Sequence, residues 1–208
     1  MTEGTGSITC WCPEGQSYQS TGCADVPTDC NDYENNVCGL GYYCHASSPS
    51  CTAGGNGTCT KISSANDNEG TKTAGGYWVR EYTMDWFSAN SWCIGKGRSG
   101  LIRLSTLNIA LPDDGLGYCD FPDSEYYPGD VANEGEVAAC KTVDGMTMTR
   151  ENDYAHYLAT LQEQMGSDYY WTRDVLTSDS CGAWYLGLYY GYVNSYTRSN
   201  DSGYALCE

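Results

Sequence analysis

The residues of this sequence that could do chemistry are concentrated in a tyrosine-rich stretch from Tyr185 to Tyr204. Tyrosine, serine, asparagine and glycine dominate there, and eight of the nineteen tyrosines lie between Tyr169 and Tyr204. Antibody loops use the same residues, because tyrosine supplies rigid contact area with a hydroxyl while the smaller polar residues adapt their hydrogen bonds. The stretch predicts non-covalent recognition of a protein or glycan ligand. The alternative is a tyrosine-rich exposed hairpin of an ordinary structural domain.

Strand alternation predicts which of these side chains face outward. Trp184, Leu186 and Leu188 share one parity and are expected to pack inward. Tyr185 and Gly187 share the other parity, and a register error of one residue would exchange the two sets. The predicted ligand-binding residues are Tyr185, Tyr189, Tyr190, Tyr192, Asn194, Tyr196, Thr197, Ser199, Asn200 and Asp201. Residues of the preceding loop are expected to form the edge of this surface, namely Arg173, Asp174, Ser178 and Asp179.

The same stretch has a second regularity, which is genetic. Each residue from Tyr185 to Tyr204 either can be reached from the asparagine codon AAC by changes at its adenines or is interpreted as a fixed scaffold position. The residues Glu, Gln, Lys, Met and Trp, which that codon cannot give, are absent from it. Since Glu and Lys are among the commonest residues of ordinary domains, their absence favours a diversified segment.

Thirteen cysteines in 208 residues predict disulfides and therefore an exported protein in an oxidising compartment. Zinc is the alternative, but the spacing lacks paired C-x₂-C knuckles, and only His45 and His156 are present. Eight cysteines fall between Cys10 and Cys59, where almost no aliphatic side chain occurs. Such a segment buries too little apolar area to fold without cross-links, so four are expected, with their pairing left open by the sequence.

Charge and hydropathy exclude two kinds of partner. The sequence has ten basic and twenty-seven acidic residues, which gives a formal net charge of −17. Nucleic-acid surfaces need clustered Lys and Arg, so DNA and RNA are not expected partners. No apolar run is long enough to span a bilayer, so no direct membrane insertion is expected. Met1 is followed at once by polar and glycine residues, which we interpret as a processing start without a signal peptide.

Composition divides the chain into three parts. Residues 1–62 are predicted to form a disulfide-rich module, and its runs Cys38–Cys44 and Cys51–Cys59 resemble extracellular modules of the epidermal-growth-factor kind. Residues 63–76 contain no aromatic side chain and have the composition of a linker. Aromatic density rises at Tyr77, where the second domain, 77–208, is expected to begin.

The first half of the second domain is predicted to hold two helices. Thr83 is expected to cap a helix from Asp85 to about Lys96. A second helix is predicted over 154–165, because apolar residues recur there at helical spacing and Gly166 follows. Short strands are expected at 77–82 and 101–104. The acidic stretch 112–145 is interpreted as an insertion, closed by Cys119 and Cys140.

After the second helix the pattern predicts only strands. Gly191 is expected to mark a hairpin between the middle two of them. Two early helices and several late antiparallel strands predict an α+β domain. The expected strands are Tyr169–Thr172, Ala183–Tyr189, Tyr192–Tyr196 and Tyr204–Cys207.

This order resembles the C-type lectin fold, and particular residues support the resemblance. The segment Trp86–Cys93 resembles the first helix of that family, which carries a cysteine at this point. The segment Tyr204–Cys207 resembles its last strand, and Tyr170–Thr172 lies where the family has its central aromatic strand. The resemblance covers about residues 77–208 and implies a disulfide between Cys93 and Cys207.

Calcium-dependent sugar binding is an alternative function within that family. Members that bind sugar through calcium carry Glu-Pro-Asn or Gln-Pro-Asp and then Trp-Asn-Asp, and none of these triplets occurs here. Asp174 or Asp179 could meet a calcium ion, but two residues do not supply six to eight oxygens. We therefore expect no cofactor, with calcium as the alternative. The acidic residues of the 112–145 insertion lack the spacing of an EF-hand loop and are interpreted as a solvated surface.

Cys181 is left without a partner if Cys93 pairs with Cys207 and Cys119 with Cys140. A buried thiol or a bond to a partner chain is then expected. An oxidase reaction like that of the formylglycine-generating enzymes, which have a lectin-like core, is a weaker alternative because a lone cysteine lacks the paired ligand. The run Gly95–Gly100 matches G-x-G-x-x-G, but a helix precedes it and a strand follows, opposite to the dinucleotide fingerprint.

Together, the lectin-like order, the short loop after Trp171 and the tyrosine-rich hairpin resemble the variable proteins of diversity-generating retroelements. Such proteins display a C-terminal surface, mutated at adenines, on a C-type lectin fold. The resemblance implies a non-enzymatic, receptor-like or adhesin-like bacterial protein at the cell surface, whose disulfide-rich stalk presents the binding domain. A purely structural cell-surface domain is the remaining alternative.

Overall fold

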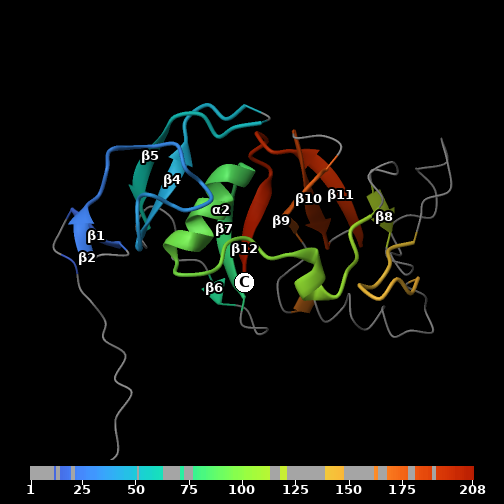
Figure 1. Ribbon diagram of the computed structural model, residues 1–208. Coiled ribbons are helices and arrows are strands. Elements are labelled where there is room, and N and C mark those ends of the chain that lie inside the picture. The colour runs from blue at the N-terminus through green and yellow to red at the C-terminus, as the bar shows by residue number, and fades with distance from the viewer. Residues whose placement is uncertain are drawn as a thin grey trace, which may run out of the picture.

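In the residues that it describes, the computed structural model of the protein combines the α-helix α2 (Trp86–Gly95) with mostly antiparallel strands (Figure 1). This agrees with the predicted α+β class. Of the predicted second helix only Gln162 and Glu163, which are helical, are described. Within the described part of the chain, no helix is long and apolar enough to cross a membrane. The described residues are 12, 15–19, 22–50, 52–62, 71–72, 77–112, 118–120, 139–147, 162–163, 168–177, 181–188 and 191–208.

The largest sheet has seven strands in the order β6-β7-β12-β9-β10-β11-β8. Its pairs are antiparallel except for β12 and β9, which run parallel. All four strands predicted for the end of the chain are present as β9 to β12, and Gly191 turns between β10 and β11 with a φ of 71°. The strands are β6 (Thr71–Lys72), β7 (Trp78–Met84), β8 (Tyr118–Asp120), β9 (Tyr169–Val175), β10 (Gly182–Gly187), β11 (Tyr192–Thr197) and β12 (Gly203–Cys207).

Alternation along β10 agrees with the predicted register. Trp184, Leu186 and Leu188 are almost fully buried and belong to one apolar cluster beneath the sheet. Tyr185 lies on the opposite face and is only partly buried. Because consecutive side chains of a strand point to opposite faces, this register fixes which residues of the neighbouring strands share the outer face with Tyr185.

The N-terminal part of the chain forms two small sheets. The first is the hairpin of β1 (Gln16–Gln19) and β2 (Gly22–Asp25), and the second pairs β3 (Asp29–Cys30), β5 (Gly57–Lys61) and β4 (Tyr42–Ala46). Three disulfides within it join Cys12 to Cys23, Cys30 to Cys44 and Cys38 to Cys59. The sulfurs of Cys30, Cys38 and Cys59 lie close together, but each is already in a disulfide and is no free metal ligand.

Two expected disulfides of the remaining cysteines are present, but the prediction for Cys181 is corrected. Cys93 is bonded to Cys207, and Cys119 to Cys140. The prediction that Cys181 has no partner within the chain is wrong, because Cys181 is disulfide-bonded, to a cysteine outside the described residues. The prediction rested on the eight N-terminal cysteines pairing only among themselves.

Helix α2 (Trp86–Gly95) also begins differently from the prediction. Its N-cap is Asp85, whose carboxylate accepts a hydrogen bond from the Ser88 N–H at 3.0 Å. Thr83 is held in β7 opposite Tyr204 and so cannot cap the helix. After the helix, Leu101 makes an isolated bridge to Cys207 and the predicted strand at 101–104 does not form; a 3₁₀ helix, Leu104–Leu107, begins at its last residue.

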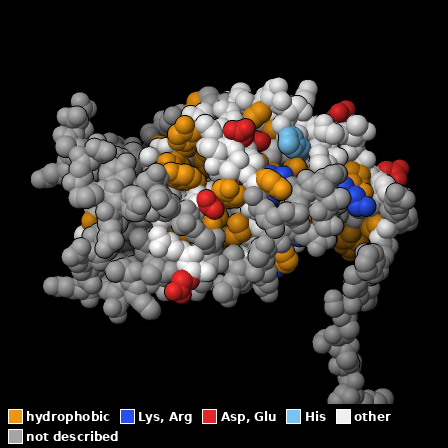
Figure 2. Space-filling view, turned by 180° about the vertical axis from the view of Figure 1, so that it is seen from behind, with side chains coloured by type: hydrophobic (Ala, Val, Ile, Leu, Met, Phe, Trp, Pro, Cys, Tyr) orange, Lys and Arg blue, Asp and Glu red, His pale blue; other side chains and the backbone are white. Residues whose placement is uncertain are grey.

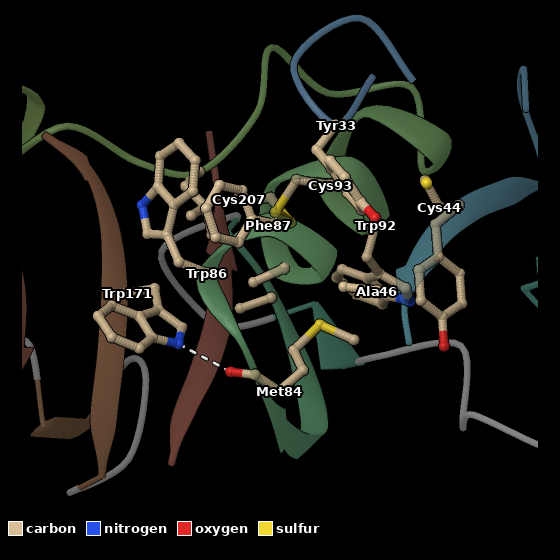
Figure 3. Packing of buried hydrophobic residues seen from close by; sticks show 14 of the residues in the cluster. Tyr33, Cys44, Ala46, Met84, Trp86, Phe87, Trp92, Cys93, Trp171 and Cys207 are labelled. Carbon is tan, nitrogen blue, oxygen red and sulfur yellow. Dashed lines mark hydrogen bonds between the residues drawn. A yellow bond between two sulfur atoms is a disulfide. The ribbon is translucent and has the colours of Figure 1, made fainter. Parts of the chain in front are cut away.

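Helix α2 packs against β4 of the N-terminal module on one side and against β12 on the other (Figure 1). One apolar cluster contains Tyr33, Cys44 and Ala46 of the module together with Phe87 and Trp92 of the helix (Figure 3). The two parts of the chain therefore share a core. We call the contact between α2 and the module's β4 the seam.

Small polar side chains of α2 complete the seam. The Ser88 hydroxyl accepts from the Ala46 N–H at 2.9 Å, and the Ser91 hydroxyl accepts from the Cys44 N–H at 2.8 Å. Ser91 also donates to the side-chain oxygen of Asn36 at 2.9 Å. These bonds satisfy buried groups at the edge of β4, because the helix supplies acceptors where another strand would otherwise pair.

Candidate ligand-binding pocket

The outer face of β9, β10 and β11 carries a pocket of about 220 Å³. Tyr185 of β10 is paired with Trp171 of β9 and with Asn194 of β11, and paired residues project to the same face of a sheet. Gly187, two residues further, is opposite both Tyr169 and Tyr192. The pocket is lined by Tyr169, Trp171, Tyr185, Tyr192, Tyr196, Ser202 and Gly203.

Two glycines allow the rings of the pocket to approach the sheet closely. A Cβ atom at Gly187 would lie 2.9 Å from two ring carbons of Tyr192. A Cβ atom at Gly203 would overlap the indole of Trp171. Any larger residue at these positions must displace a wall of the pocket, so both glycines contribute to its shape.

Tyr185 is the centre of the aromatic arrangement. Its ring centroid lies 5.8 Å from that of Tyr169, 5.9 Å from those of Tyr192 and Tyr196, and 6.2 Å from that of Trp171. The planes of these four rings make angles of 64° to 85° with the plane of Tyr185. Edge-to-face contacts of this kind are favourable aromatic geometry and hold the rings as connected walls.

The floor of the pocket is fixed by the buried indole of Trp171. Its Nε1–H donates to the carbonyl oxygen of Met84 at 2.8 Å, and only 1% of the residue is exposed (Figure 3). Next to it along β9, the carbonyl of Thr172 accepts from Trp86 Nε1 at 2.8 Å. These bonds tie β9 to β7 and to α2, so the floor is preorganised.

The lining residues that the structure describes carry no charge. The hydroxyls of Tyr185 and Tyr192 lie 3.2 Å apart, within hydrogen-bonding distance. Burial raises the pKa of Tyr185 above its ordinary value, although the hydrogen bond with Tyr192 opposes this. Tyr185 is therefore neutral at physiological pH. Among the described residues that line the pocket there is no carboxylate, imidazole or thiol that could act as an acid, base or nucleophile.

The other predicted binding residues that the structure describes in β11 and the turn after it are not in the lining of this pocket. The turn after β11 is closed by a bond from the Asn200 N–H to the Thr197 carbonyl at 2.9 Å, and the Asn200 side chain accepts from the Ser202 N–H. Ser199 and Asp201 belong to the same turn, and Asp201 is exposed. Asn194 faces Tyr185, and its side-chain oxygen accepts from the Ser195 N–H at 2.7 Å. Four predicted residues lie outside the described part of the chain: Ser178, Asp179, Tyr189 and Tyr190.

Arg173 and Asp174 are not among the residues that line the pocket. They line a different hollow, together with Glu34 of the module and Arg103. Arg173 donates to the Ser99 carbonyl at 3.0 Å. The Asp174 carboxylate accepts from the Leu104 N–H at 2.8 Å and lies 3.6 Å from the Arg103 guanidinium. Burial raises the pKa of Asp174. Its carboxylate contacts Leu104 and Arg103 rather than the tyrosines of the pocket.

Four of the seven described residues that line the pocket were not predicted from the sequence. Tyr169 and Trp171 have the same alternation as Tyr185, but their position became visible only with the pairing of β9 and β10. Ser202 and Gly203 follow the turn after β11 and join the pocket because β12 lies directly beside β9. The available signal was Tyr169-Tyr170-Trp171, an aromatic run with one member buried beneath the sheet and two above it.

Comparisons of the chain with protein-family models, with curated proteins and with solved structures found no match. The candidate function therefore depends on the pocket itself.

Proposed function

We propose that this chain is an exported ligand-binding protein that displays a diversified tyrosine-, serine- and asparagine-rich surface on a C-type-lectin-like fold. It recognises a protein ligand without catalysing a reaction, as a receptor or adhesin does. The aromatic pocket is the centre of that surface. The disulfides of the structure are compatible with the oxidising environment of an extracellular protein.

One observation carries the proposal. Tyr185, Tyr192 and Tyr196 come from the stretch whose composition matches an antibody paratope, and they line a single open pocket. Tyr196 is 45% exposed although it is a large aromatic residue. Binding hot spots are enriched in tyrosine and tryptophan at the centre of a desolvated patch. A rigid aromatic floor with an exposed rim is suited to that role.

A random peptide library displayed on phage tests ligand binding directly. Selection on the immobilised wild-type protein should enrich peptides that lose at least roughly tenfold in affinity when Tyr192 and Tyr196 are both replaced by Ser. Tyr82, which is 56% exposed on β7, supplies the control, and Tyr82→Ser should bind the same peptides unchanged. Enriched peptides that bind the double variant equally well would exclude the pocket as the binding site.

The genomic surroundings of the gene test the diversification. We expect a reverse-transcriptase gene and a near-copy of the segment encoding Trp171 to Cys207, which differs from it only at adenines. Codons of outward residues such as Tyr192 and Tyr196 should differ, while those of the buried Leu186 should not. If no such copy exists, the surface is fixed, and the ligand-binding proposal then depends on the peptide selection alone.

A further inference from the structure

The electrostatic character of the pocket narrows the chemistry of its occupant. Tyr185 meets its four aromatic neighbours at steep angles, so the cavity is enclosed by rings on several sides. The faces of aromatic rings carry negative potential, and so do phenolic oxygens. A group surrounded by such walls is favoured if it is positively charged.

The described charge next to the pocket is negative. Asp201, which is exposed, precedes Ser202 of the lining. Asp168 lies near Tyr170, on the opposite face of the sheet. The nearby arginines are directed elsewhere: Arg173 donates to Ser99, and Arg198 packs over the ring of Phe87 at 4.9 Å. The chain as a whole carries a formal charge of −17. Lys and Arg cover little of the described surface on the face seen in Figure 2.

We infer that the pocket binds the cationic side chain of a lysine or arginine of its protein ligand. This inference rests on the proposed ligand-binding function and names the group that enters the pocket. A cavity of about 220 Å³ lies below the roughly 300–1,000 Å³ of sites that enclose drug-sized ligands, so it suits one side chain. Negative potential around the entrance attracts basic partners and discourages acidic ones.

Blocked pentapeptides that differ at one position provide the test. Their sequence is Gly-Gly-Xaa-Gly-Gly with acetylated and amidated ends, so that Xaa carries the only charge. Arginine is compared with its neutral near-isostere citrulline, and lysine with norleucine. In NMR titrations of the wild-type protein, the charged peptide of each pair should bind at least roughly tenfold more tightly. Replacement of Tyr196 by Leu, which keeps apolar bulk but removes the ring, should reduce that preference, whereas Tyr82→Leu should not.

Several outcomes would overturn the inference. Equal affinity of citrulline and arginine, or of norleucine and lysine, would show an apolar pocket without preference for charge. A preference for a methyl glycoside over every peptide would show a sugar site. The absence of binding by either charged peptide at millimolar concentration would also contradict it. Phage-selected peptides that depend on Tyr192 and Tyr196 but lack basic residues would overturn the cation inference while leaving the proposed function intact.

Discussion

The seam and the pocket are built from similar residues but are used in opposite ways. Both combine large aromatic rings with small uncharged polar groups; the seam lies between α2 and β4, whereas the pocket lies on strands of the seven-stranded sheet. In the seam, the hydroxyls of Ser88 and Ser91 are bonded to backbone N–H groups of the module. In the pocket, the hydroxyl of Tyr185 meets that of another tyrosine, and the cavity above it is open.

The difference shows that composition alone does not separate an internal contact from a recognition surface. In the seam, the helix surface is covered by a segment of the same chain. The hydroxyls of Ser88 and Ser91 on that surface are hydrogen-bonded to this segment. The pocket has rigid walls, in which the rings of Tyr169, Tyr192 and Tyr196 each contact the ring of Tyr185. Stability should therefore depend on the seam, and ligand binding on the pocket.

Removal of one large aromatic side chain from each region tests this division. Trp92→Ala in the seam should reduce the free energy of unfolding by about 3–5 kcal/mol, because Trp92 is fully buried. Tyr196→Ala in the pocket should cost about 1 kcal/mol or less, because the ring is half exposed and loses mainly one edge contact. Denaturant unfolding with disulfides intact measures both. Similar losses for the two variants would mean that the pocket is part of the stabilising core.

A smaller change tests whether the seam depends on its hydrogen bonds. Ser91→Ala leaves the Cys44 N–H and the Asn36 side-chain oxygen without a partner, which should cost about 2 kcal/mol. Ser105→Ala is the matched control at an exposed position and should stay within about 0.5 kcal/mol of the wild type. The same unfolding experiment compares them. A loss below about 0.5 kcal/mol for Ser91→Ala would show that water replaces the missing hydroxyl and that the seam is looser than its geometry indicates.

The strands of the pocket were predictable because their local signals agree. Alternation between Trp184, Tyr185 and Leu186 sets one buried face, and Gly191 adopts the positive φ that its hairpin requires. The full pocket was not predictable, because its lining depends on which strands lie side by side. The parallel pairing of β12 with β9, which brings Gly203 to Trp171, is a long-range contact without a local signature.

The seam was missed for a different reason. Periodicity suggested that one face of the first helix is buried, yet α2 is buried almost all round. A signal was present, because no charged residue occurs between Trp86 and Gly95. A helix without a charged face has no side that favours water, and it is covered on several sides. The disulfide of Cys181 was not predicted either.

The helix cap at the seam gives the smallest expected effect, and it depends on pH. Burial raises the pKa of Asp85, although its bonds with Ser88 lower it in part. The folded protein therefore binds a proton at Asp85 at a higher pH than the unfolded chain does, in which the carboxyl has its ordinary pKa of about 3.8. The stabilisation from this proton is complete below that value and is lost as the pH rises through the folded pKa.

Asp85→Asn separates this contribution from those of other carboxylates. Asparagine caps helices about as well as aspartate but does not titrate. The free energy of unfolding of the wild type, minus that of Asp85→Asn, should therefore increase as the pH is lowered from 7 to 4. Asp174, whose pKa is also raised by burial, is common to both proteins and cancels in the difference. A difference that falls toward acid pH would mean that the carboxylate is stabilised in its charged form, which would make the seam a more polar contact than its buried side chains indicate.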